Sequence, residues 1–215
     1  DKYYAPLKRS NLKKDQISRD RRKAKFRRRV YNVVTENVIF ADARDGLVYS
    51  DRRVPSEVLL CFLLTNSGTG YLYNELVQKS KVQSINAGCY PDKDPGMSSL
   101  YVSGMPGKSV KETEKTYLNA LKAFPSWLKD SDIERAKLYF LSANWSSLRD
   151  PNDLAEGLAE YTIKANNPMY FFNLTEKVQK VTRADILARW NEWSKRKQTR
   201  VLINPSKKSD PLKKR

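Results

Sequence analysis

The chain has 215 residues, with 41 lysines and arginines against 24 aspartates and glutamates, and it contains no histidine. This length allows one sizeable globular core, or a smaller core with terminal extensions. The absence of histidine excludes a histidine-ligated zinc site, a histidine general base and a serine-histidine triad within this chain. A free-standing enzyme is therefore not expected, and we predict no catalytic residue, no metal site and no cofactor.

The excess positive charge is concentrated at the two ends of the chain. Residues 1–30 carry 13 basic and 3 acidic side chains, and residues 206–215 carry 5 and 1, so these two segments hold 14 of the 17 excess charges. The middle of the chain is nearly neutral. This distribution predicts a basic N-terminal arm over residues 1–35, a globular domain over residues 36–205 and a basic C-terminal tail over residues 206–215.

Residues 12–30 contain neither glycine nor proline and are rich in good helix formers, which predicts a helical arm. Its apolar residues are too sparse for a stripe that would pack against a core. The basic cluster at residues 25–29 repels itself, so we expect the arm to need an anionic partner. Its three acids and few serines argue against a retained targeting peptide.

From residue 31 the composition becomes that of a folded domain. Apolar triplets at 38–40 and 47–49, on either side of the turn signal Asp45-Gly46, predict a strand or a hairpin. Pro55 begins a predicted helix that contains the longest apolar run, seven residues, which is too short to span a bilayer. A turn at 66–70 separates it from a second predicted helix over 71–81.

Two strands are predicted next, over residues 82–87 and 99–103, and capping boxes then mark helix starts at Ser109, Ser131 and Thr182. A further helix is expected over residues 154–165, and residues 201–203 form a closing strand. The helix that follows Ser131 is expected to bury one face, which is formed by Ile133, Ala136, Phe140 and Trp145. The other three tryptophans are also expected in the core: Trp127, Trp190 and Trp193.

This order of elements predicts an α+β fold. Strand, two helices, two strands, several helices and a final strand are typical of a two-layer sandwich with a mainly antiparallel sheet and helices on one face. The basic terminal extensions lie outside this sandwich.

Three motifs receive structural interpretations. Cys61 and Cys89 lack the spacing of a metal site and are too few for a disulfide framework, so we interpret them as buried thiols in a reducing compartment. Gly68-Thr69-Gly70 lacks the other residues of a phosphate-binding motif and is interpreted as a plain turn. The carboxylates of residues 130–134 are interpreted as helix caps, because they lie at a helix N-terminus.

Three segments carry a resemblance to a known family. They are GYLYNELVQKSKVQSINAG (70–88), DIERAKLYFLSANWSSLRDPNDLAEGLAEYTI (132–163) and VQKVTRADILARWNEWSKRKQTRVLINP (178–205). Together with the two strands and the capped helix between them, they resemble the pitrilysin family. That family includes insulin-degrading enzyme, the mitochondrial processing peptidase and the core proteins of the respiratory cytochrome bc complex. The resemblance covers residues 36–205, and residues 1–30 and 206–215 match nothing in it.

The resemblance implies a chain without catalysis. Family subunits contain two related halves, of which the catalytic half carries the zinc motif H-x-x-E-H, and this motif cannot exist without histidine. The chain looks like the other half, which in active members supplies an Arg and, seven residues later, a Tyr that hold the substrate. Those positions fall on Val77 and Ser84, and neither side chain can take these roles. The resemblance therefore implies a pseudo-peptidase half-domain.

The basic ends suggest where such a domain is used. Arginine and lysine clusters bind phosphate, and we predict a mitochondrial ribosomal protein of the matrix that contacts ribosomal RNA and neighbouring ribosomal proteins. An acidic protein groove and an anionic membrane surface are the other partners considered for the arms. The alternative function is a partner subunit of a two-chain zinc metallopeptidase or of a cytochrome bc complex, with a second peptidase-like chain. For either function we expect no small-molecule substrate and no transmembrane segment. The predicted RNA-binding residues are Lys8, Arg9, Lys13, Lys14, Arg19, Arg21, Arg22, Lys23, Lys25, Arg27, Arg28, Arg29, Lys207, Lys208, Lys213, Lys214 and Arg215.

Overall fold

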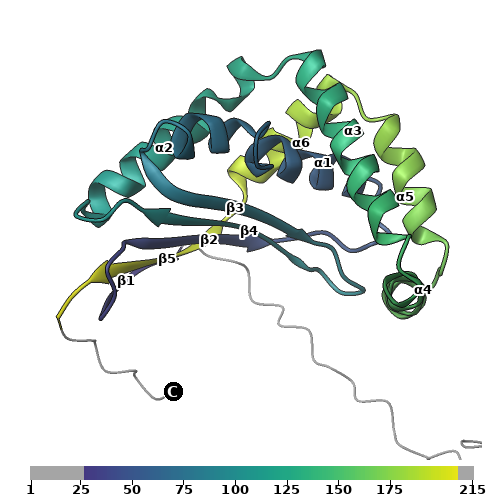
Figure 1. Cartoon of the computed structure of the whole chain (residues 1–215), viewed down its shortest axis with the longest axis horizontal. Helices are drawn as coiled ribbons and strands as arrows, with labels where there is room; N and C mark the ends of the chain where they lie inside the picture. The colour runs from purple at the N-terminus through teal and green to yellow at the C-terminus, as the bar shows by residue number, and fades with distance from the viewer. Residues whose placement is uncertain (1–26, 208–215) are drawn as a thin grey trace, which may run out of the picture.

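The structure is a computed structural model that describes residues 27–207; for Ser147 and Phe171 it describes the backbone alone. A curved β-sheet forms one layer, and the helices all lie on one side of it (Figure 1). The elements are β1 (Arg27–Val33), β2 (Ile39–Asp45), α1 (Val54–Thr65), the π-helix η1 (Tyr73–Val77), β3 (Val82–Tyr90), β4 (Met97–Gly104), α2 (Val110–Trp127), α3 (Asp130–Ser147), α4 (Pro151–Ala165), α5 (Tyr170–Gln179), α6 (Arg183–Lys195) and β5 (Gln198–Pro205).

The five strands of the described region are ordered β1-β5-β2-β4-β3, so β1 and β3 are the edge strands. The pairs β2–β4, β2–β5 and β3–β4 are antiparallel, and only β1–β5 is parallel. The predicted α+β sandwich with a mainly antiparallel sheet and helices on one face is therefore confirmed.

The core lies between the sheet and the helices. Side chains alternate between the two faces of a strand; in β2 and β4 every second residue is buried toward the helical layer, as are Arg200 and Leu202 of β5. The apolar run of α1 supplies the opposite wall. Residues with no more than 1% exposure in this core include Phe40, Leu100, Val102, Leu202, Leu59, Leu60, Leu64, Tyr117, Phe124 and Ile186.

The helix starts follow local capping chemistry. The Ser109 and Thr182 side chains each accept a hydrogen bond from the backbone of the third helical residue, as predicted for capping boxes. The box predicted at Ser131 is displaced: α3 begins at Asp130, and the Asp132 carboxylate accepts from the Lys129 backbone amide at 3.0 Å. The carboxylates of this segment thus include a helix cap, as predicted, and residues 67–69 form the predicted turn.

The prediction of a helical arm over residues 1–35 is wrong for residues 27–33, which form β1, and residues 1–26 lie outside the described region. Residue Val30 pairs with Leu202 of β5, and the Arg28 guanidinium donates to the Glu114 carboxylate of α2 at 2.8 Å. Pairing to β5 and this ion pair outweigh a weak helix propensity, because tertiary contacts routinely override propensity. The folded domain therefore begins before residue 36.

Three further predictions need correction. Residues 47–49 do not form a hairpin with β2, which pairs with β4 and β5; Val48 makes only an isolated bridge to Asp92. The helix predicted over 71–81 is shorter and contains the π-helix η1, and α5 was not predicted. Trp145, expected in the core, is 54% exposed, whereas Trp190 and Trp193 are buried. Earlier in the same helix, Phe140 still contacts Phe62 of α1, with 5.6 Å between the ring centroids.

A buried polar cluster fastens α2 to the sheet. The Asp42 carboxylate, fully buried in β2, lies 3.0 Å from the Arg44 guanidinium and 3.5 Å from the Arg200 guanidinium of β5. Arg200 also pairs with Glu114 at 2.9 Å, and the Tyr117 hydroxyl donates to Asp42 at 3.4 Å. Buried charges need such partners, so this cluster fixes the register between helix and sheet.

Candidate functional site

Four of the predicted RNA-binding residues lie within the described region. Arg27, Arg28 and Arg29 lie in edge strand β1, and Lys207 follows β5 at the end of the described region. Arg28 is engaged with Glu114, and this hydrogen bond is the main cause that lowers the pKa of the Glu114 carboxyl. The other thirteen predicted residues lie outside residues 27–207. The described region therefore presents the start of a basic edge and not a complete RNA-binding surface.

The two positions implied for the substrate pair lie on neighbouring elements. Val77 ends η1 and packs, partly buried, against the core, whereas Ser84 is exposed in edge strand β3. A valine side chain has no hydrogen-bond donor, and a serine hydroxyl is short. These two positions cannot hold a substrate carbonyl in the way that an arginine and a tyrosine can.

A groove of about 550 Å³ lies beside these positions, between α1 and edge strand β3. Six consecutive residues of β3, 85–90, form one wall. The opposite wall comes from α1 and the turn after it, with Tyr73 of η1 at one end. The groove is therefore lined by aromatic and aliphatic side chains together with small polar ones, and none of its lining residues is an Asp, Glu, Lys or Arg.

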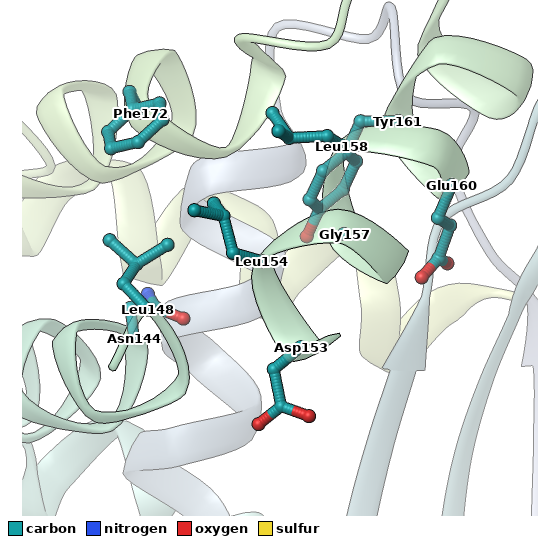
Figure 2. A pocket seen from close by; sticks show the side chains of 9 residues that line it. All are labelled: Asn144, Leu148, Asp153, Leu154, Gly157, Leu158, Glu160, Tyr161 and Phe172. Atoms are coloured by element: carbon teal, nitrogen blue, oxygen red, sulfur yellow. The ribbon is translucent and has the colours of Figure 1, made fainter. Parts of the chain in front are cut away.

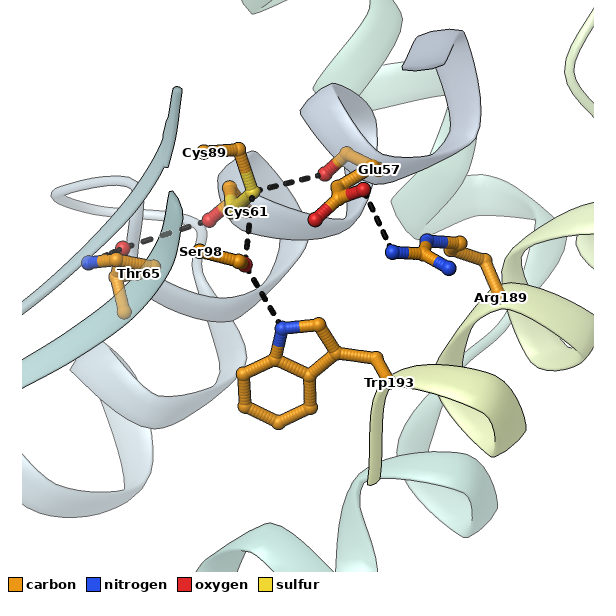
Figure 3. Close-up of a disulfide and its surroundings, with 8 residues drawn as sticks. Glu57, Cys61, Thr65, Cys89, Ser98, Arg189 and Trp193 are labelled. Carbon is orange, nitrogen blue, oxygen red and sulfur yellow. Dashed lines mark hydrogen bonds and ion pairs between the residues drawn. A yellow bond between two sulfur atoms is a disulfide. The ribbon is translucent and has the colours of Figure 1, made fainter. Parts of the chain in front are cut away.

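One face of α1 contacts β3 along this groove, through residues spaced four apart (Figure 3). Thr65 accepts a hydrogen bond from the Ala87 backbone amide at 2.8 Å. Cys61 forms a disulfide with Cys89, with 6.4 Å between the two Cα atoms, and the Glu57 backbone carbonyl lies 3.3 Å from the Cys89 sulfur. The interpretation of both cysteines as free thiols is wrong: residues 28 apart in sequence are brought together where α1 crosses the strand.

The same helix face is tied to α6 by a buried ion pair. The Glu57 carboxylate accepts from the Arg189 guanidinium at 2.6 Å, and both side chains are no more than 3% exposed (Figure 3). Beside it, the Trp193 indole donates to the Ser98 hydroxyl of β4 at 2.8 Å. The groove wall is thus part of a connected set of polar contacts that joins α1, α6 and the sheet.

A smaller cavity of about 170 Å³ lies between α4 and the ends of α3 and α5 (Figure 2). Its walls include Leu148, Leu154, Leu158 and Phe172, while the rim carboxylate of Glu160 is paired with Lys164. Helix α4 buries none of its residues completely. This cavity thus lies beneath a peripheral helix, between leucine and aromatic side chains, with Asn144 and Asp153 as further polar lining residues.

A cluster of metal ligands is absent from the described region. Between residues 27 and 207 no three Asp, Glu, Cys or His side chains gather as metal ligands, and the whole chain lacks histidine. Buried tyrosines are not acid-base groups at neutral pH, because burial raises the pKa of Tyr170 to about 12 and that of Tyr117 well above its usual value. No helix in the same region has the length and apolar character needed to cross a membrane.

The geometry defines a two-layer α+β domain with an open groove and, within residues 27–207, no cluster of metal ligands. The family model described as the Peptidase M16 inactive domain matches residues 2–139, so the chain belongs to this family. Two predictions are thereby confirmed, the pitrilysin-like half-domain and the absence of catalysis. The match begins at residue 2, so the expectation that residues 1–30 match nothing in the family is wrong.

Solved structures share this fold at low sequence identity. A protease from Helicobacter pylori matches with a TM-score of 0.78 and 16% identity over 85% of this chain and 45% of its own. The inactive peptidase domain of a protein described as a zinc protease from Bordetella parapertussis gives 0.70 and 19% over 82% and 96%. A chain of complex III2 from Candida albicans gives 0.68 and 13% over 82% and 45%. A search of curated protein sequences gave no significant match.

The chain therefore spans less than half the length of the Helicobacter and Candida chains that it matches. The contacts that Thr65 and Cys61 of α1 make with Ala87 and Cys89 of β3 were not predicted from the sequence. The spacing of Glu57, Cys61 and Thr65 by four is the signal that they share a helix face. Nothing in the sequence indicates which strand that face meets.

Proposed function

We propose that this chain is the non-catalytic half of a two-part M16 assembly and pairs with a zinc-binding half that lies outside residues 1–215. The supporting observation is that the fold of the inactive half is present while the chain has no histidine to ligate zinc. In the Helicobacter and Candida chains the matched part is 45% of the chain, so more than half of each chain is additional sequence. The role is then structural, as a wall of a substrate chamber or as a core subunit.

The experiment mixes the purified chain with a histidine-containing zinc half and measures complex formation by size-exclusion chromatography with light scattering. We expect a one-to-one complex and no peptide cleavage by this chain alone. In the complex, V77R/S84Y, which restores the two donors, is expected to increase peptide cleavage, and V77A/S84A is the matched control without donors. Failure to form a complex, or cleavage by the chain alone, would refute the proposal.

We also propose, as a second possibility for the chain, a role as a mitochondrial ribosomal protein, because 14 of the 17 excess charges lie in 40 terminal residues. Polycationic segments bind ribosomal RNA through phosphates, with an affinity that falls as salt rises. The matrix location is part of this proposal. The test compares the full chain with residues 27–215, a truncation that leaves β1 intact. Loss of salt-sensitive, nuclease-sensitive co-sedimentation with the ribosome supports this proposal, and an unchanged profile contradicts it.

A further inference from the structure

The Cys61–Cys89 disulfide lies at the free edge of the sheet. β3 is an edge strand, and its Ala87 amide points away from β4, toward the Thr65 hydroxyl at 2.8 Å. In an antiparallel strand the outward-pointing amides alternate, so the amides of Ile85 and Cys89 point to the same side. The disulfide thus holds α1 beside a row of backbone groups that β4 does not pair.

This disulfide is reachable from solvent. Both cysteines are partly exposed, and both line the open groove of about 550 Å³. A structural disulfide in a sealed core can be attacked only after unfolding, whereas thiol-disulfide exchange needs access of a thiolate to one sulfur. The groove is wide enough to provide that access to a small dithiol in the folded chain.

The reduced state is also accommodated by the surroundings. The Cys89 sulfur lies 3.3 Å from the Glu57 backbone carbonyl and 3.7 Å from the Ser98 hydroxyl, so a Cys89 thiol has an acceptor in place. Helix α1 keeps two other attachments, the Thr65–Ala87 hydrogen bond and the Glu57–Arg189 ion pair. Reduction therefore removes one of three attachments and leaves the fold held by the others.

We propose that Cys61–Cys89 is a reversible redox clamp that holds α1 against the edge of β3 when oxidised and releases this edge when reduced. A dithiol reductant attacks one sulfur through its thiolate, forms a mixed disulfide and then closes on itself. The protein gains two electrons and two protons as two thiols, and the reductant becomes a cyclic disulfide. The Ala87 amide, which α1 protects through the Thr65 hydroxyl, then exchanges its hydrogen faster.

The test uses the full oxidised chain in native buffer, with dithiothreitol as the probe. After incubation, N-ethylmaleimide traps free thiols, mass spectrometry counts them, and hydrogen exchange is measured over Val82–Tyr90. We expect two trapped thiols, unchanged far-ultraviolet circular dichroism and exchange at Ala87, the outward amide that Thr65 binds, faster by about tenfold, as for a local opening. In a second sample that is not alkylated, oxidised glutathione is expected to restore the slow rate.

Two variants serve as controls. C61S/C89S is expected to exchange Ala87 at the fast rate with or without dithiothreitol. T65V removes the acceptor, so exchange at Ala87 is expected to be fast before reduction and unchanged by dithiothreitol. Labelling that requires denaturant, global unfolding on reduction, or unchanged exchange after labelling would each overturn the proposal. So would purified protein whose two thiols do not pair under glutathione redox buffer.

Discussion

The buried pair between Glu57 and Arg189 gives the sharpest test of the energetics. Its atoms are 2.6 Å apart, and the two side chains are 3% and 1% exposed. Arg189 has a second carboxylate partner, Glu192, at 2.8 Å, whereas within residues 27–207 the Glu57 carboxylate forms an ion pair with Arg189 alone. The two single changes are therefore unequal.

Arg189→Met leaves a buried carboxylate without a cation, and we expect a loss of about 3–5 kcal/mol in the free energy of unfolding. Glu57→Gln leaves Arg189 with Glu192, and we expect about 1.5–3 kcal/mol, the range for a hydrogen bond to a charged group. The double variant E57L/R189M removes both charges and keeps apolar bulk. Its free energy of unfolding is expected within about 1 kcal/mol of that of the unmodified chain, because a packed apolar pair often replaces a buried ion pair without loss of stability.

Urea unfolding followed by tryptophan fluorescence measures these values, since Trp190 and Trp193 lie on the same helix as Arg189. The matched control is Glu75→Gln, which removes an exposed pair with Lys79 and is expected to cost no more than about 0.5 kcal/mol. The reasoning is refuted if the effects of the two single changes add in the double variant, because additive effects mean no coupling.

Two further predictions concern packing and acid stability. Trp190→Ala is expected to lower the free energy of unfolding by about 3–5 kcal/mol, because Trp190 is 6% exposed. Trp145→Ala, at a 54% exposed position, is expected to change it by no more than about 0.5 kcal/mol. Equal urea midpoints for the two variants would contradict this placement of the tryptophans. The Arg53 guanidinium lowers the pKa of Asp51 to about 2, below the unfolded value of about 3.9. Its contribution is therefore complete above about pH 4 and lost as pH falls toward 2, so Asp51→Asn is expected to flatten the urea-midpoint profile between pH 5 and 2. A profile with the same slope in both proteins would contradict this.

Local chemistry made much of the fold predictable. The capping boxes at Ser109 and Thr182 involve residues three apart, so the sequence already contains both partners of each hydrogen bond. The order of the predicted strands and helices was sufficient to predict an α+β sandwich. The absence of histidine determined that no histidine-ligated zinc site is present in the chain, whatever its fold.

The long-range contacts were decided by the tertiary structure alone. Residues 27–33 read locally as helix and became a strand because β5, more than 160 residues later, offers pairing. Asp42 lies in a segment that reads as a turn, and it is buried because Arg44 and Arg200 meet it there. Cys61 and Cys89 carry no mutual signal at a spacing of 28, and only the crossing of α1 over β3 brings them together. Contacts within one helical turn are set by the local sequence, whereas contacts between distant segments depend on how whole faces pack.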